Sequence, residues 1–244
     1  VAHRRHVLFL SRAVTAMSQA APRRSVRSFV IRAGRMTEAQ QRALDDLLPR
    51  YRVDSAALRE DFPAVFPRQA PLYLEIGSGN GDNALALAAR LPDIDILASE
   101  VHPPGVGHTV HEAARLALAN LRIFDGDALE LLAALPPASL DAVFIFFPDP
   151  WPKKRHHKRR LVQGELLNLL ATRLKRHGRA RFASDDADYA LQVRDALSAD
   201  RRWFNVAGAG AWAPRPNERI LTRFEQRAIR DGRPVFELCW MRAI

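Results

Sequence analysis

The chain has 244 residues, of which 48% are hydrophobic and 26% charged, a composition typical of one globular domain with a sizeable core. Its single cysteine, Cys239, excludes an internal disulfide and a zinc site built on several thiolates, and it fits a reducing compartment such as the cytoplasm. No apolar run approaches the ~18 residues of a membrane-spanning helix. We therefore expect a cytoplasmic protein without a membrane segment.

The net charge of +10 is concentrated in two short segments. Residues 1–35 contain eight arginines and no acid, and residues 153–160 contain six lysines or arginines and no acid, so the rest of the chain is mildly acidic. This asymmetry favours a polyanionic partner that meets particular segments. For residues 1–22 we prefer the simpler interpretation, a disordered basic tail, and for residues 153–160 we prefer a functional one.

The first residues resemble a signal peptide only faintly, because the apolar run at residues 7–10 is too short. The sequence opens with Val1, and we hypothesise that synthesis starts at Met17, with residues 1–16 being upstream translation. The intact mass of the native protein tests this hypothesis.

The hydrophobic pattern predicts elements that alternate along the chain. Residues 37–51 read as a helix with Thr37 as its N-cap, and residues 61–67 as a linker broken by proline. From there the pattern predicts, in order, a strand at 72–76, a helix at 83–90, a strand at 94–99, a helix at 105–119, a strand at 121–124, a helix at 128–135, a strand at 142–147, a helix at 161–175, a strand at 179–183, a helix at 187–197, and a last strand at 235–241 with a partner near 204–212.

This alternation predicts an α/β fold with a doubly wound, mostly parallel, Rossmann-like sheet. We divide the chain into a basic N-terminal arm and helix, residues 1–60, and one domain, residues 61–244. Sheets of this kind bind ligands at the carboxyl ends of their strands.

A glycine turn follows the first predicted strand. Residues 77–81 read Gly-Ser-Gly-Asn-Gly, which allows tight turning and close approach of the backbone to a ligand at Gly77. The spacing is not the G-x-G-x-x-G of a dinucleotide site. The turn alone is weak evidence, because tight turns need glycine anyway.

Three acids strengthen the interpretation, because they stand at three consecutive strand ends. Glu100 is placed to accept the hydroxyls of an adenosine ribose, and Asp127 to accept the adenine amino group. Glu75 is placed to hold an ammonium group. Each acid alone is better explained as a helix cap or a solvated loop residue. Together they favour a cationic adenosyl cofactor, S-adenosyl-L-methionine, over a pyrophosphate cofactor, which they would repel.

A rigid loop follows the most apolar predicted strand. Residues 146–152 read Phe-Phe-Pro-Asp-Pro-Trp-Pro, so that three prolines restrict the backbone, Asp149 reaches the crevice and Trp151 offers a face for stacking on a base. The basic run at residues 153–160 comes next. Such runs usually serve solubility, but its position beside this loop favours RNA binding.

Residues 146–160 closely resemble the F-F-P-D-P-W-x-K-x-R-H-x-K-R-R signature of bacterial tRNA (guanine-N7-)-methyltransferases. The resemblance covers roughly residues 25–242. Further matches, in chain order, lie at residues 27–30, Arg35, 74–77, 100–107, 120–122, 183–185, 189–190 and 221–227.

The resemblance implies a class I fold, a monomer, and transfer of the methyl group of S-adenosyl-L-methionine to N7 of the variable-loop guanine of tRNA. Together with Gly77 of the turn, the family's cofactor contacts fall on Glu75, Glu100, Asp127 and Asp149, and Asp149 is also its active-site residue. Its tRNA contacts fall on Lys153, Asp185, Thr222, Arg223, Phe224 and Glu225. Its basic RNA-interaction segment falls on Arg155, His156, His157, Lys158, Arg159 and Arg160. From spacing alone, Phe224 is better explained as a core residue.

The chain departs from the family pattern at four places. The glycine turn lacks the usual G-F-G-M-G, Ser184 replaces a threonine, residues 217–220 replace a segment with Ser-Arg-Pro, and Ala228 replaces a glycine. These departures concern the packing around the methionine part of the cofactor and the docking of tRNA.

Because guanine N7 carries a lone pair and no proton, we assign Asp149 to positioning and electrostatics rather than to proton removal. A metal site is not expected, because His102, His108, His111 and Glu112 do not form an H-E-x-x-H motif. Three alternatives stay open at this point: a methyltransferase for another acceptor, an RNA-binding protein with a vestigial cofactor site, and a dinucleotide oxidoreductase.

Overall fold

The computed structural model describes residues 28–29, 35–217 and 219–243, and the structural statements below concern these residues. The predictions of a disordered tail at residues 1–22 and of a start at Met17 fall outside the described residues. Within them, no helix is long and apolar enough to cross a membrane.

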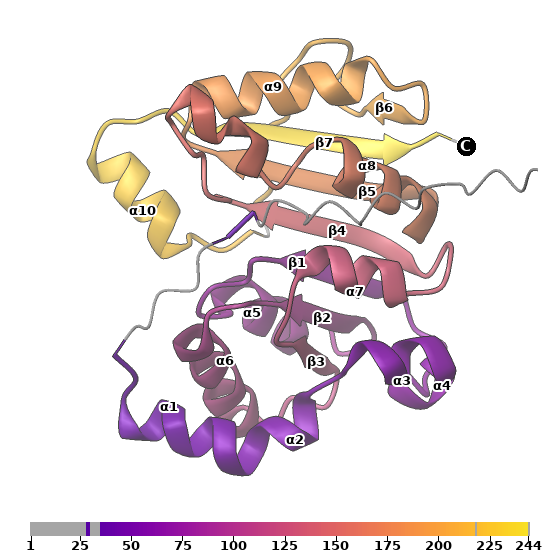
Figure 1. Cartoon of the computed structure of the whole chain (residues 1–244), viewed down its shortest axis with the longest axis vertical. Coiled ribbons are helices and arrows are strands. Elements are labelled where there is room, and N and C mark those ends of the chain that lie inside the picture. The colour runs from indigo at the N-terminus through magenta and orange to yellow at the C-terminus, as the bar shows by residue number, and fades with distance from the viewer. Residues whose placement is uncertain (1–27, 30–34, 218, 244) are drawn as a thin grey trace, which may run out of the picture.

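The described residues form one seven-stranded sheet with the strand order β3-β2-β1-β4-β5-β7-β6 (Figure 1). Its strands are β1 (Leu72–Ile76), β2 (Asp95–Ser99), β3 (Leu121–Phe124), β4 (Leu140–Phe146), β5 (Leu174–Ser184), β6 (Trp203–Asn205) and β7 (Phe236–Arg242). The pairs among β1–β5 are parallel, whereas β7 runs antiparallel to both β5 and β6. The predicted doubly wound, mostly parallel sheet is confirmed.

Helices cover both faces of this sheet (Figure 1). They include α5 (Asp82–Arg90), α6 (Pro103–Arg115), α7 (Ala128–Ala134), α8 (Gly164–Arg173) and α9 (Ala187–Ser198). One core cluster joins the sheet to α7, α8 and α9, with Leu131 and Leu170 fully buried, and a second joins it to α5 and α6, with Val110 fully buried. Central strands with helices on both faces are largely apolar, and β4 is apolar from Ala142 to Phe146.

The segment before the sheet packs onto this body. Helix α1 (Glu38–Arg42) has Thr37 as its N-cap, as predicted, and Thr37 and Gln40 form a capping box. The chain continues through the π-helical η1 (Ala43–Leu47) into α2 (Leu48–Tyr51). Tyr51 is buried in the core. The domain boundary at residue 60 remains a prediction.

Two segments differ from the sequence-based prediction. The segment expected to be a linker, residues 61–67, contains the short helix α4 (Phe62–Val65), which follows α3 (Ser55–Glu60). Asp61 caps α4, and Pro63 lies in its first turn, where proline is tolerated. Between β6 and β7 lies α10 (Arg223–Arg230), capped by Thr222, where no helix was predicted.

Candidate active site

The glycine turn lies between the carboxyl end of β1 and the start of α5. Gly77 and Gly79 have φ values of +71° and +59°, which non-glycine residues rarely adopt, and a Cβ at either would meet no atom within 4 Å. Gly81 (φ +77°) has no such space, because its Cβ would lie 2.3 Å from Thr109 Oγ1. The turn therefore leaves free volume beside its first two glycines and packs tightly at the third.

Glu100 joins the turn to the end of β2. Its Oε2 accepts a hydrogen bond from the Gly79 N–H at 2.6 Å, and its Oε1 accepts from the N–H groups of Val101 and His102, both at 2.8 Å. Glu100 is buried, so it fixes the glycine turn as well as standing where an adenosine ribose is expected. On the other side of the turn, His108 Nδ1 of α6 lies 2.8 Å from the carbonyl oxygen of Asn80.

Glu75, at the end of β1, is a buried acid whose Oε2 has no hydrogen-bond partner among the described residues. Burial raises the pKa of its carboxyl from 4.5 to about 8, although a hydrogen bond from the backbone of Ala84 acts in the opposite direction. At neutral pH Glu75 is therefore mostly protonated and lacks a partner for this oxygen. A cationic group beside it would both satisfy Oε2 and lower the pKa.

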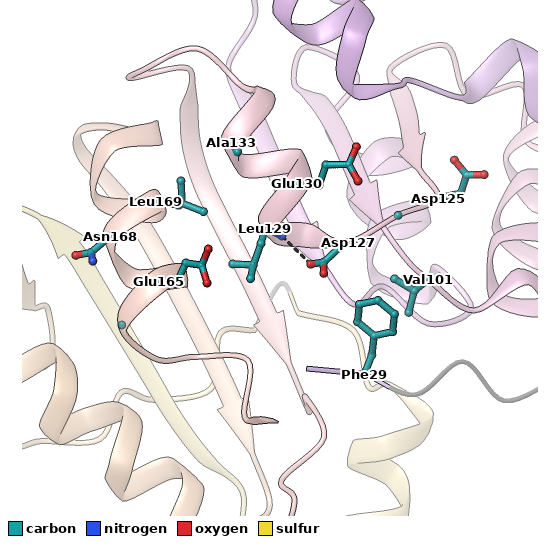
Figure 2. A pocket seen from close by; sticks show the side chains of 12 residues that line it. Phe29, Val101, Asp125, Asp127, Leu129, Glu130, Ala133, Glu165, Asn168 and Leu169 are labelled. Atoms are coloured by element: carbon teal, nitrogen blue, oxygen red, sulfur yellow. Dashed lines mark hydrogen bonds between the residues drawn. The ribbon is translucent and has the colours of Figure 1, made fainter. Parts of the chain in front are cut away.

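A cavity of about 1090 Å³ opens at the ends of β2 and β3, between α7 and α8 (Figure 2). Four carboxylates and no basic residue belong to its described lining, the acids being Asp125, Asp127, Glu130 and Glu165. Asp127 also caps α7, because its Oδ1 accepts from the Leu129 N–H at 2.9 Å, the contact dashed in Figure 2. The cavity does not reach Glu75, Gly77 or Glu100, which lie at the neighbouring strand ends.

The loop after β4 is held in a strained conformation. Phe147 and Trp151 have φ values of +52° and +47°, which are uncommon for bulky residues and cost of order 1 kcal/mol or more each. The Phe147 N–H donates to the Ala183 carbonyl at 2.8 Å, so the loop begins anchored to β5. Asp149 lies exposed between the two strained residues.

Arg160 supports this loop from inside. It is only 2% exposed; its Nε donates to the Pro150 carbonyl (2.8 Å), its Nη1 to Gln192 (2.6 Å) and its Nη2 to Asp188 (2.7 Å). Its guanidinium also lies over the ring of Tyr189. Arg160 is therefore buried and held by partners within the protein, unlike the exposed members of the basic run, and its contact with RNA stays a prediction.

The remaining basic residues form an exposed edge beside the loop, which we call the basic edge: Lys153 and the 3₁₀ helix η2 (Lys154–Arg159). Lys153, Lys154, Arg155 and Lys158 are exposed, whereas His156, His157 and Arg159 are half-buried. The basic edge thus follows the Asp149 loop directly along the chain, whereas the acidic cavity is lined by the segments after β2 and β3, by α7 and by α8.

Trp151 links several of these parts instead of offering a free face. Arg159 lies 5.0 Å from its ring centroid and the His156 ring contacts it edge-on at 5.8 Å. Its Nε1–H donates to the carbonyl oxygen of Ser28 at 3.1 Å. The expected role as an open stacking platform for a base does not fit these contacts.

The segment around α10 reverses another expectation. Phe224 is 61% exposed, so its assignment to the core by spacing is wrong, and Glu225 beside it is only 2% exposed. Glu225 Oε1 accepts hydrogen bonds from Arg215 Nε at 2.6 Å and from Arg219 Nη2 at 2.8 Å. The ion pairs turn the acid inward and the phenylalanine outward.

Of the other predicted tRNA contacts near α10, two have partners within the protein and one is exposed. Thr222 caps the helix, and Asp185 forms an ion pair with Arg233, so both have partners within the protein. Arg223 is exposed. Arg219, which was not singled out from the sequence, is buried; it also pairs with Glu237 and lies under the rings of Phe146 and Phe147.

The chain is similar in sequence to known methyltransferases. Residues 69–238 match a family model described as "Putative methyltransferase". The chain is 45% identical over 223 residues to the tRNA (guanine-N(7)-)-methyltransferase of Nitrosospira multiformis, covering 91% of this chain and 96% of the relative. It is 47% identical to the enzyme of the same name from Pseudomonas aeruginosa, covering 90% and 91%. The chain belongs to the tRNA (guanine-N(7)-)-methyltransferase family.

Solved structures of other methyltransferases share the fold of this family member. A 16S rRNA (adenine(1408)-N(1))-methyltransferase from Catenulisporales acidiphilia, solved with S-adenosylmethionine, superposes with a TM-score of 0.55 at 15% identity, covering 79% of this chain and 92% of its own. The 16S rRNA methyltransferase KamB gives 0.54 at 15% identity, covering 87% and 97%. The predicted family, fold and enzyme class are confirmed.

Proposed function

We propose that this methyltransferase transfers the methyl group of S-adenosyl-L-methionine to N7 of the variable-loop guanine of tRNA. The observation that carries the proposal is that the Asp149 loop leads directly into the basic edge, while Trp151 of the same loop contacts Ser28, whose neighbour Phe29 lines the acidic cavity. A cationic methyl donor suits the acidic cavity and a polyanion suits the basic edge. That the protein acts as a monomer in the cytoplasm remains a prediction.

The residues at the strand ends fit S-adenosyl-L-methionine. Glu75 Oε2 is a buried oxygen without a partner in the part of the chain that the structure describes, which suits the methionine ammonium. The open space at Gly77 lets the backbone approach that part of the cofactor. Glu100 would receive the ribose hydroxyls, and Asp127 the adenine amino group. Because Glu100 and Asp127 would repel phosphates and Glu75 suits an ammonium group, the fit favours the adenosyl cofactor over a dinucleotide.

The cofactor supplies a methyl group bonded to a positively charged sulfur. The protein must bring guanine N7 into line with it, which is a task of orientation, and no base is needed because N7 carries a lone pair. Asp149 accepts hydrogen bonds from guanine N1–H and the exocyclic amine in this proposal, and its charge stabilises the positive charge that passes to the purine. The strained, anchored loop holds Asp149 ready for this contact.

Two surfaces are available to tRNA. Lys153 and the exposed cations of the basic edge would meet phosphates, while Arg223 and the exposed ring of Phe224 offer a second contact on α10. Asp185, Thr222 and Glu225 would act mainly by holding α10 in place, since each already has a partner within the protein.

The test is methyl transfer from labelled cofactor to unmodified tRNA, with nucleoside mapping of the product. Label at N7 of the variable-loop guanine is the expected result. Absence of label in tRNA, with measurable cofactor binding, would move the proposal to another methyl acceptor. Absence of cofactor binding would point to an RNA-binding protein with a vestigial site.

A second experiment tests the role of Asp149. Asp149→Asn should slow single-turnover methylation with bound tRNA by about a hundredfold, as removal of one electrostatic contact at a reacting centre does. Asp93→Asn, at an exposed position before β2, is the matched control and should leave the rate unchanged. An unchanged rate in Asp149→Asn would refute the assigned role.

A further inference from the structure

Phe29 lies far from the strand ends in sequence but lines the acidic cavity. The other lining residues nearest to it in Figure 2 are Val101, which follows Glu100, and Asp127, which begins α7. Phe29 is half-buried, so part of its ring surface remains available to a ligand in the cavity. It adds an aromatic face to a part of the cavity whose other lining residues include Val101, Asp127 and Leu129.

A hydrogen bond of the preceding residue anchors the chain beside Phe29. The carbonyl oxygen of Ser28 accepts the hydrogen bond from Trp151 Nε1 at 3.1 Å. Trp151 is itself held by Arg159 and His156 of η2. A chain of direct contacts thus runs from the basic edge through Trp151 to the wall of the cavity.

We propose that Phe29 is a cofactor-binding residue that stacks on the adenine of S-adenosyl-L-methionine, and that Trp151 is the positioning residue that holds it there. The proposal rests on the proposed function, because it takes the cavity beside Asp127 as the adenine site. Val101 and Leu129 supply apolar contacts, Asp127 selects the exocyclic amine, and Phe29 supplies the aromatic face. Trp151 then serves the cofactor site rather than stacking on a tRNA base.

The direct test is the affinity for S-adenosylhomocysteine, measured by isothermal titration without tRNA. Phe29→Ala should weaken binding about tenfold, within the range for loss of one stacking contact between an aromatic side chain and a base. Phe29→Tyr keeps the ring and should restore the affinity. Phe204→Ala, on the exposed side of β6, is the matched control and should bind as the wild type does.

The adenine itself is tested with 5′-methylthioadenosine, which lacks the amino-acid part of the cofactor. Phe29→Ala should weaken its binding by the same factor as for S-adenosylhomocysteine. A loss seen with S-adenosylhomocysteine alone would overturn the assignment to adenine, because Phe29 would then act near the methionine part.

Trp151→Phe tests the positioning role, because it keeps an aromatic ring and removes the N–H that bonds Ser28. It should weaken S-adenosylhomocysteine binding about threefold, and it should add little in the Phe29→Ala background, since residues in one network are not additive. Full additivity of the two losses would overturn the link through Ser28.

The outcomes separate this inference from the proposed function. If wild-type protein binds S-adenosylhomocysteine and Phe29→Ala binds equally well, the inference fails and the proposed function stands. If wild-type protein binds neither adenosine compound, the proposed function fails as well. Thermal unfolding of each variant shows whether a loss of affinity reflects a loss of folding.

Discussion

Replacing Glu75 by glutamine is expected to stabilise the folded protein increasingly as the pH rises. Glu75 is buried at the end of β1, and burial raises the pKa of its carboxyl from 4.5 to about 8. Because the pKa is higher in the folded than in the unfolded chain, the stability associated with the neutral acid is complete below about pH 4.5. It is lost progressively as the pH rises through about 8.

The magnitude follows from the size of this shift. Each pH unit between the two pKa values changes the free energy of unfolding by about 1.4 kcal/mol, so the loss between roughly pH 5 and pH 8 is about 3–4 kcal/mol. A glutamine side chain cannot ionise, so the Glu75→Gln variant should escape this loss. The difference in free energy of unfolding between Glu75→Gln and the wild type should therefore grow by that amount over the same range.

Urea unfolding of the wild type and of Glu75→Gln at four pH values between 5 and 8 measures this difference. Comparing the two proteins at each pH cancels the titration of all other groups. Glu60→Gln, at an exposed acid that ends α3, is the matched control and should follow the wild type. A difference that stays constant with pH would refute the reasoning, because Glu75 would then ionise in the folded protein as easily as in the unfolded one.

Three further predictions concern the cofactor, the loop and the RNA surface. Binding of S-adenosylhomocysteine at pH 7 should release most of one proton, since the ligand ammonium ionises a mostly protonated Glu75. Isothermal titration in buffers of different ionisation enthalpy measures this release, and equal binding heats in all buffers would contradict it. Arg160→Met should lower the free energy of unfolding by about 2 kcal/mol or more and slow tRNA methylation, whereas the exposed control Arg201→Met should do neither. Replacing the two lysines and one arginine of residues 154–158 by glutamine should reduce the slope of log affinity for tRNA against log salt by about 2, and an unchanged slope would remove this segment from the interface.

The sheet and the strand-end acids could be predicted from the sequence because they depend on local signals. A run of apolar residues that ends in a glycine turn or an acid marks a buried parallel strand and its carboxyl end, and parallel strands place those ends along one edge. Glu75, Glu100 and Asp127 were found in this way. The family signature around Asp149 added the active-site loop.

The residues that could not be predicted are those whose partners are distant in the sequence. Arg160 looks like the last member of a uniform basic run, but Asp188 and Gln192 of α9 draw it inside. Glu225 looks exposed and Phe224 looks buried until Arg215 and Arg219 are placed beside the acid. At these positions ion pairs between distant residues decide which side chain is buried, rather than the spacing of hydrophobic residues along the chain. A single sequence does not show which charged residues pair.

The distribution of charge around the cavity has a consequence for competition among adenosine compounds in the cell. ATP carries the same adenosine as S-adenosyl-L-methionine, but its phosphates would extend along the strand ends past Glu100 and Glu75. The described wall of the cavity adds four carboxylates, of which Asp125 is paired with Arg52 at 2.9 Å, and its described lining contains no basic residue. In the proposed function this lining would disfavour nucleotide phosphates by repulsion, without any contact that recognises the methyl group.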